Sequence, residues 1–218
     1  MKIAIASGKG GTGKTSLAVN LAALLAENRE VVLVDMDVEE PNSGIFFNLD
    51  EAETIPREKL IPSWDNEKCI PCGICHDACN FNAIVRILDE IIVMPQLCHS
   101  CHACSLLCPE SALPMKSRPM GEVRMADIGN IHLVENRLNV GEEQAVPLIT
   151  QSLEYLDKEY DANTVIIMDS PPGASCPVIE VALGADLVIL VAEPTPFGLN
   201  DLKIAVETMR KLEREFAV

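Results

Sequence analysis

A glycine-rich loop near the start of the chain constrains the fold more than any other feature. Residues 8–15 read Gly-Lys-Gly-Gly-Thr-Gly-Lys-Thr and come directly after the apolar run Lys2–Ala6. A helical pattern over residues 14–27 and a second apolar run, Glu30–Asp35, follow the loop. Apolar runs without alternation are typical of parallel strands that are buried on both faces. This order predicts a βαβ unit and therefore an α/β fold.

The loop matches the pattern G-x-x-x-x-G-K-[ST], which binds the phosphates of a nucleotide. Glycines let backbone N–H groups turn toward phosphate oxygens, and the N-terminus of the following helix adds positive charge. Lys14 offers a cation to the β- and γ-phosphates, and the Thr15 hydroxyl suits Mg²⁺. An unliganded glycine turn would not need this strand and helix around it. We therefore expect ATP and Mg²⁺ to bind at Gly8, Lys9, Gly10, Gly11, Thr12, Gly13, Lys14, Thr15 and Ser16.

The α/β pattern continues beyond residue 120. A hairpin of Glu122–Asp127 and Ile131–Leu138 is expected to turn at Gly129-Asn130. Further strands are expected at Thr164–Asp169 and Asp186–Ala192, and helices at Val146–Leu156, Val178–Leu183 and Leu199–Phe216. The spacing of apolar residues predicts core-facing sides of the first and last helices. These sides are Leu17, Leu21, Leu24 and Leu25 in the first, and Leu199, Leu202, Val206, Met209, Leu212 and Phe216 in the last.

Eight of the nine cysteines crowd between Cys69 and Cys108. They form two runs with the spacing C-x₂-C-x₂-C-x₃-C, and each cysteine recurs 29 residues later. Two such runs are the pattern of bacterial ferredoxins with two [4Fe-4S] clusters, in which the fourth cysteine of each run binds the other cluster. We expect one cluster on Cys69, Cys72, Cys75 and Cys108, and the second on Cys98, Cys101, Cys104 and Cys79.

Other metal chemistry remains an alternative for these cysteines. Two segments match the haem-attachment pattern C-x-x-C-H, but that reading leaves four of the eight cysteines without a role. Structural zinc could use cysteine pairs with His76, His99 or His102, although zinc sites seldom repeat a three-then-one spacing. Outside zinc sites the three histidines are expected to tune the clusters or to be bystanders. Cys176 stands apart, as a buried residue at a helix start or as a ligand of a cluster shared between subunits.

The glycine loop also resembles the deviant Walker A motif of the MinD/ParA/nitrogenase-iron-protein family. In that family a lysine equivalent to Lys9 reaches the nucleotide of the facing subunit, which implies an ATP-dependent homodimer with Lys9 acting in trans. Val34-Asp35-Met36-Asp37 resembles the first switch segment, so Asp37 is expected to orient water or contact Mg²⁺. Met168-Asp169-Ser170-Pro171-Pro172-Gly173 resembles Walker B and the second switch. Asp169 is then expected to hold Mg²⁺ and Gly173 to approach the γ-phosphate.

The resemblance implies a doubly wound, mostly parallel sheet formed by residues 1–61 and 120–218. A small α+β ferredoxin-like domain, residues 62–119, is inserted in it. In this family a further strand carries an asparagine that contacts the adenine, whereas this sequence stops at Phe216-Ala217-Val218. Either the sequence is cut short there or the base site is unusual.

Charge and hydropathy limit the kinds of partner that are expected for the chain. The formal net charge is −16, which disfavours nucleic acid. No apolar run approaches the length of a membrane span, and no signal peptide is evident, so a cytoplasmic location without membrane insertion is expected. Many cysteines in a reducing compartment favour metal or redox chemistry over disulfides.

Joined on one chain, the two motifs predict an ATPase that couples nucleotide state to electron transfer through two clusters, with an unidentified redox or acceptor protein as partner. One alternative is an ATPase that assembles or carries iron–sulfur clusters or another metallocofactor. Another is a regulatory switch that uses the clusters to sense redox state.

Overall fold

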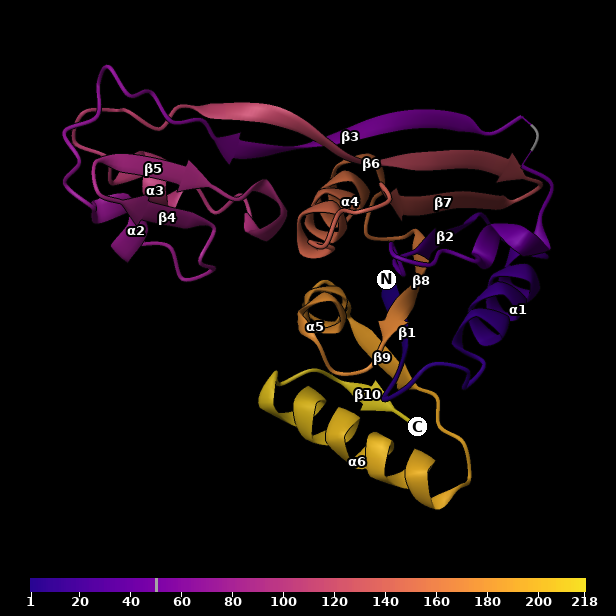
Figure 1. Ribbon diagram of the computed structural model, residues 1–218. Coiled ribbons are helices and arrows are strands. Elements are labelled where there is room, and N and C mark those ends of the chain that lie inside the picture. Colours follow the sequence, from indigo (N-terminus) through magenta and orange to yellow (C-terminus); the bar gives the residue numbers. More distant parts are fainter. Residues whose placement is uncertain (50) are drawn as a thin grey trace.

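A computed structural model describes residues 1–49 and 51–218 of the chain. Within these residues an eight-stranded sheet has the order β10-β9-β1-β8-β2-β7-β6-β3. Figure 1 shows this sheet with helices on both sides and a small lobe at one end. The strands are β1 (Lys2–Ser7), β2 (Val31–Asp35), β3 (Glu53–Pro62), β6 (Met115–Ile128), β7 (Ile131–Leu138), β8 (Val165–Pro172), β9 (Leu187–Leu190) and β10 (Phe216–Ala217).

The six strands from β10 to β7 run parallel, as the apolar runs predicted. All five residues of β2 are buried between β8 and β7, which explains the absence of alternation in Val31–Asp35. The register pairs Asp35 with Asp169, so both carboxylates lie at the carboxyl edge of the sheet. The α/β, doubly wound and mostly parallel fold is therefore confirmed.

The helices divide between the two faces of the sheet. Ile3 and Ile5 of β1 face α1, whereas Ala4 and Ala6 face the other three helices, as the period of two in a strand requires. The helices are α1 (Lys14–Ala26), α4 (Val146–Glu159), α5 (Cys176–Leu183) and α6 (Pro196–Lys211). Within the described residues, none of the helices is both long and apolar enough to cross a bilayer.

The expected core face of the first helix was partly wrong. Ala18, Val19 and Ala22 of α1 are buried against the sheet, whereas Leu17 and Leu24 are exposed. Leu21 and Leu25 pack only at the margin of this core. Small side chains let the helix axis approach the sheet closely, which the count of leucines could not indicate.

The expected last helix was wrong at both ends. Thr195 begins α6 earlier, because its hydroxyl accepts a hydrogen bond from the Gly198 N–H at 3.0 Å. The helix ends at Lys211, and Glu213 shortly after it has a φ of 53°. Phe216 lies in β10, which pairs in parallel with β9. Leu199 is exposed instead of facing the core.

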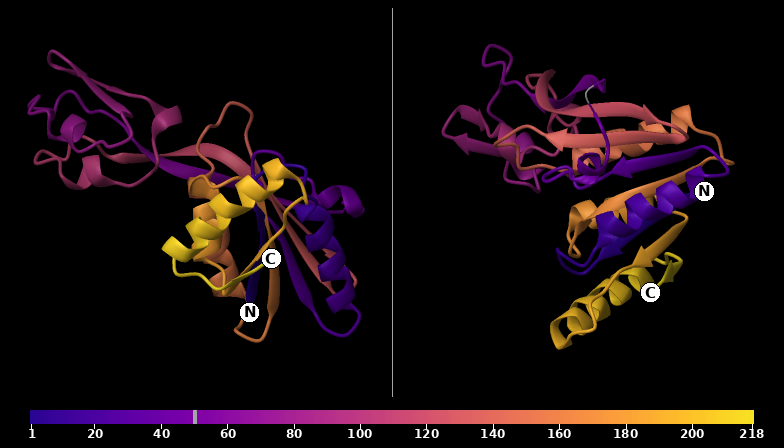
Figure 2. Two further views of the ribbon diagram at one scale, coloured as in Figure 1. Left: turned by 90° about the horizontal axis from the view of Figure 1, so that it is seen from below. Right: turned by 90° about the vertical axis from the view of Figure 1, so that its right-hand side faces the viewer.

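An antiparallel ribbon of β3 and β6 forms the far edge of the sheet and extends beyond it. The register of the ribbon shifts between Arg57 and Glu58, as in a β-bulge. The sequence analysis did not identify β3, and it identified only part of β6. Figures 1 and 2 show the cysteine-rich lobe at the end of this ribbon, to one side of the sheet.

The lobe lies between Pro62 and Met115, the last pair of the ribbon. It contains a two-stranded sheet of β4 (Ile84–Ile87) and β5 (Glu90–Val93) with two one-turn helices, α2 (Ile74–Asp77) and α3 (Ala103–Leu106). Two 3₁₀ turns, η1 (Ser43–Phe46) and η2 (Pro95–Leu97), complete the elements described. The expected boundary of the inserted domain, residues 62–119, remains a prediction.

Candidate functional site

The glycine loop joins the carboxyl end of β1 to the first turn of α1, as predicted. Gly13 precedes α1 with a φ of 90°, a backbone conformation that residues with a Cβ atom avoid. A Cβ atom at Gly8 would lie 2.4 Å from the carbonyl oxygen of Asp201 in α6, so only glycine fits there. The loop is thus held between two helices, with the backbone of Gly10 and Gly11 facing open space.

Lys14 and two carboxylates face one another beside this loop. Burial lowers the pKa of Lys14, although the charges of Asp169 and Asp37 oppose that shift. Burial raises the pKa of Asp37 to about 6 and that of Asp169 to about 7, and in both cases the charge of Asp35 adds to the shift. The structure therefore brings Lys14, Asp37 and Asp169 together, as the sequence analysis expected.

Asp169 offers a ligand position that suits a divalent cation. Its Oδ1 atom is buried and has no hydrogen-bond partner among residues 1–49 and 51–218, while Oδ2 lies 3.5 Å from the Ser43 hydroxyl. A hydrogen bond from the Thr15 side chain lowers the pKa of Asp169, but burial outweighs it. Within the described residues, the Thr12 hydroxyl of the glycine loop is also buried without a partner. Unpaired buried oxygens are costly, so these residues fit a bound Mg²⁺–nucleotide complex.

Asp35 is a residue of this site whose role the sequence analysis missed. Its carboxylate accepts backbone N–H hydrogen bonds from Asp37 (3.0 Å), Asn42 (2.9 Å) and Ser43 (2.8 Å). Burial nevertheless raises its pKa. Asp35 thereby fixes the course of the chain from the end of β2 to η1, which places Asp37 beside Lys14.

The second segment of the site follows β8. Gly173 has a φ of 97° and donates its N–H to the carbonyl oxygen of Ser7 at 2.9 Å. Gly173 therefore lies beside the end of β1, where the glycine loop begins. A cavity of about 670 Å³ separates this segment from the residues after β2 and is lined by Asp37, Val38, Glu39, Glu40, Ala145, Pro171, Pro172, Ser175 and Pro177.

Lys9 points toward its own chain. Its Nζ atom lies 2.7 Å from Oε2 of Glu193, and both side chains are about one-third exposed. Any reach of Lys9 toward a facing subunit must therefore break this contact.

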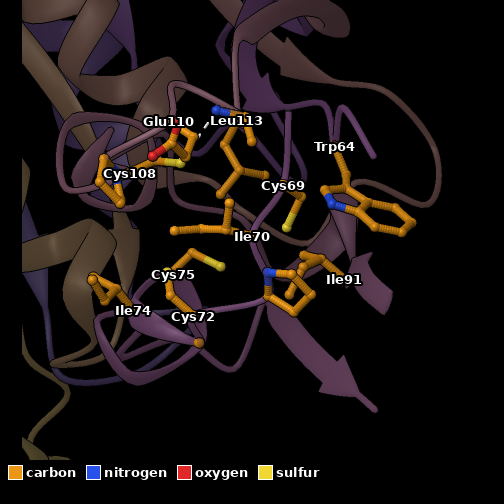
Figure 3. A pocket seen from close by; sticks show the side chains of 14 residues that line it. Trp64, Cys69, Ile70, Cys72, Ile74, Cys75, Ile91, Cys108, Glu110 and Leu113 are labelled. Atoms are coloured by element: carbon orange, nitrogen blue, oxygen red, sulfur yellow. Dashed lines mark hydrogen bonds between the residues drawn. The ribbon is translucent and has the colours of Figure 1, made fainter. Parts of the chain in front are cut away.

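The eight clustered cysteines line two cavities in the lobe. The first encloses about 370 Å³ and is lined by Cys69, Cys72, Cys75 and Cys108, with Trp64, Ile91 and Leu113 around them. Figure 3 shows the sulfur atoms of Cys69 and Cys75 pointing toward the space between them, with Trp64 at the margin. The Ala112 N–H donates to the Cys108 sulfur at 3.2 Å. Cys108 thus joins three cysteines of the other run.

The second cavity encloses about 350 Å³, and its cysteines are Cys79, Cys98, Cys101 and Cys104. The one-turn helices behind the two cavities begin at equivalent positions, after Gly73 and His102, and both residues have positive φ. Each cavity thus takes three cysteines from one run and the fourth from the other, which is the grouping expected from the spacing. Cluster ligation itself remains a prediction.

The chemistry of the cavities suits a metal group that is held by thiolates. Burial raises the pKa of Cys75, Cys98 and Cys104, the last to about 11, so thiols in an empty cavity hold their protons and a bound metal displaces them. Within the described residues, no three His, Cys, Asp or Glu side chains gather closely enough for one metal ion. Four thiols around each cavity suit a metal group that is held by thiolates.

The remaining candidates lie at the margins. His99 stacks on Phe81 with ring centroids 3.8 Å apart, and His99 and His102 line the second cavity. His76 contacts the carbonyl oxygen of Ile84 through Nδ1 at 2.8 Å. Cys176 lies exposed at the start of α5 and lines neither cavity, so the expectation that it is buried was wrong.

Comparison with known proteins extends these observations. The sequence pattern of the CobQ/CobB/MinD/ParA nucleotide-binding domain matches residues 3–218. An uncharacterized protein of Methanocaldococcus jannaschii is 35% identical over 221 residues, which cover 100% of this chain and 76% of that protein. The iron–sulfur cluster carrier protein of Pyrococcus horikoshii is 28% identical over 97% of this chain and 58% of its own length.

Among solved structures, the fold is similar to that of the septum site-determining protein MinD from Pyrococcus horikoshii in complex with Mg-ADP. The TM-score is 0.54 at 19% sequence identity, and the match covers 99% of this chain and 67% of that one. At this identity the similarity concerns the fold alone.

Proposed function

The chain belongs to the CobQ/CobB/MinD/ParA family of nucleotide-binding domains, and from this we propose that it is an ATPase that carries iron–sulfur clusters to acceptor proteins. The observation that carries the proposal is the joining of a nucleotide loop to two cavities that are each lined by four cysteines. Relatives named iron–sulfur cluster carrier proteins, which match 97% of this chain, support it.

In the nucleotide half of the proposal, Lys14 and the backbone of the glycine loop bind the phosphates of ATP. Thr15, Asp37 and Asp169 hold Mg²⁺, which supplies positive charge to the γ-phosphate during hydrolysis. Asp35 keeps Asp37 in position through the three N–H hydrogen bonds that it accepts. A homodimer closed by ATP would bring Lys9 across to the facing nucleotide once its contact with Glu193 breaks.

In the cysteine half, the two cavities hold [4Fe-4S] clusters as cargo. Cys72 and Cys101 are exposed, so an acceptor thiol can approach each cavity from solvent. During transfer the cluster keeps its oxidation state and exchanges four thiolates of this chain for thiolates of the acceptor. The vacated thiols take up the protons that the acceptor thiols lose.

Electron transfer gated by ATP is a second candidate, and one observation favours it. Each cavity takes its fourth cysteine from the other run, so the ligands of the two clusters would be interlocked along the chain. Such interlocked ligation is typical of ferredoxins, which retain their clusters.

The deciding experiment starts from protein that is reconstituted anaerobically with iron and sulfide. Iron, sulfide and EPR spectra are measured first, and the protein is then mixed with an apo-ferredoxin with and without Mg-ATP. A carrier transfers clusters at a rate that depends on nucleotide, and the Lys14→Ala variant loses that dependence. Clusters that stay in place while their reduction depends on ATP would support electron transfer instead. Zinc or no metal in the cavities would contradict both.

A further inference from the structure

A buried ion pair connects the cysteine lobe to the nucleotide-binding part of the chain. Nζ of Lys59, in β3, lies 2.6 Å from Oε1 of Glu142, and the two side chains are 0% and 3% exposed. Burying two charges is costly unless they remain paired, so neither can move far without the other. Lys59 and Glu142 therefore behave as one mechanical unit.

The lysine end of this pair holds the second cysteine loop. Lys59 Nζ also donates to the carbonyl oxygen of Cys98 at 3.2 Å, at the start of the loop that lines the second cavity. The Ser100 hydroxyl donates to the carbonyl oxygen of Leu60, the next residue of β3. Two successive residues of β3 thus fix this loop at two points.

The connection that contains Glu142 contacts the nucleotide site. Glu142 lies in the connection between β7 and α4, and at its start Leu138 donates its N–H to the carbonyl oxygen of Val38 at 2.8 Å. At its end Ala145 lines the cavity that also contains Asp37 to Glu40. A shift of the segment after Asp37 on nucleotide binding would therefore press on both ends of the connection.

The first cysteine loop has no equivalent tie. Ser63 donates its N–H to Pro114 and Asp65 donates to Ala112, and both contacts stay inside the lobe. In the described part of the chain, no hydrogen bond or ion pair joins residues 69–77 to the nucleotide-binding part. The two cavities are similar in size and ligands but differ in how they are held.

We infer that Lys59 and Glu142 are positioning residues that transmit the nucleotide state to the second cysteine cavity and not to the first. This inference rests on the proposed function and deepens it, because it names which of the two clusters ATP controls. Mg-ATP then changes how tightly Cys79, Cys98, Cys101 and Cys104 hold their cluster, while the cluster beside Trp64 is unaffected.

Trp64 makes the two cavities separable by experiment. It is the only tryptophan of the chain and lines the first cavity, so a cluster bound there quenches its fluorescence. Reconstituted protein is mixed with an iron chelator, with and without Mg-ATP. Visible absorbance reports the loss of both clusters, and the larger part of the recovery of Trp64 fluorescence reports the first cavity, because quenching weakens with distance. The phase of absorbance loss that lacks the main recovery of fluorescence reports the second cavity. We expect Mg-ATP to change the rate of this phase about tenfold.

The test variant is Lys59→Met with Glu142→Gln, which removes both charges of the pair and leaves an amide oxygen for Arg118, whose Nη1 atom lies 3.9 Å from Oε2 of Glu142. We expect this variant to have normal iron content and ATP binding. Its second cavity should lose the cluster at about the same rate with and without Mg-ATP. Ser100→Ala, which leaves the buried pair intact, should reduce the effect in part. The matched control, Lys68→Met with Asp65→Asn, removes an exposed ion pair near the first cavity and should change nothing.

The outcomes separate the inference from the proposed function. If the nucleotide effect survives in both the double variant and Ser100→Ala, Lys59 and Glu142 do not transmit it, although nucleotide control stands. If both cavities of the wild-type protein respond equally to Mg-ATP, the inferred difference between them is wrong. If neither cavity responds, nucleotide control itself fails and the inference fails with it.

Discussion

The carboxylates at the edge of the sheet show how one residue type takes three tasks. Asp169 has a buried oxygen that is unpaired within the described residues, Asp37 is partly exposed beside Lys14, and Asp35 accepts hydrogen bonds from backbone N–H groups. The sequence analysis named Asp37 and Asp169 because a resemblance assigned them roles. Asp35 was given no role there, because a carboxylate that binds its own backbone leaves only a weak signal, here a strand-ending aspartate followed by Asn42-Ser43.

Replacing the loop lysines separates binding from hydrolysis. Lys14→Ala removes a charge-assisted hydrogen bond to phosphate worth about 1.5–3 kcal/mol, so we expect Mg-ATP affinity to fall about 10- to 100-fold. Lys9→Ala is the matched control, because Lys9 pairs with Glu193 and not with its own nucleotide site. It should keep ATP affinity by titration calorimetry and lose ATPase activity. Equal losses of affinity would contradict a role of Lys9 in trans.

At the scale of elements, the buried strands followed from the sequence and the exposed ones did not. β2 and β8 read as apolar runs because both of their faces are covered. The edge strand β3 contains Pro56 and Pro62 and alternates exposed charges with apolar residues over only part of its length. Prolines are tolerated at a sheet edge but argue against a strand in sequence analysis, so β3 was missed.

The contact between the glycine loop and α6 can be tested directly. Gly8→Ala would place a Cβ atom 2.4 Å from the Asp201 carbonyl oxygen, so we expect a loss of about 1–3 kcal/mol in unfolding free energy, together with weaker ATP binding. Gly10→Ala is the control, since nothing lies within 4 Å of its Cβ position. Urea denaturation measures the unfolding free energy of both variants. A Gly10 variant as unstable as the Gly8 variant would rule out this packing explanation.

The crossed pairing of the two cysteine runs has its own test. Cys108 belongs to the second run but lines the first cavity beside Trp64, whereas Cys104 of the same run lines the second. Cys108→Ser should therefore abolish the quenching of tryptophan fluorescence on reconstitution, and Cys104→Ser should preserve it. Quenching that is preserved in both variants would show that each run binds its own cluster.

At the scale of the whole molecule, the two parts are stabilised by different means. The sheet has two extended apolar cores, one on each face. The lobe has a small core in which cysteines pack beside Ile84, Ile91 and Leu113. A core of this size needs support from metal ligation to hold a single structure.

Removal of iron should therefore loosen one part alone. After anaerobic chelation we expect the amides of residues 69–108 to exchange hydrogen faster, while those of β1, β2 and β8 keep their protection. Hydrogen-exchange mass spectrometry resolves the two regions in one sample. Uniform acceleration across the chain would instead indicate that the clusters stabilise the sheet as well.

The ribbon of β3 and β6 is attached to the sheet at one end and projects from it at the other. It is anchored to β7 along one side, contains a register shift at Arg57 and Glu58, and carries the cysteine lobe at its free end. Lys59 follows that shift directly, so a bend of the ribbon there would have to carry the buried pair of Lys59 and Glu142 with it. In the proposed carrier, a lobe at the free end of the ribbon would leave both cavities open to an acceptor protein that does not touch the nucleotide site.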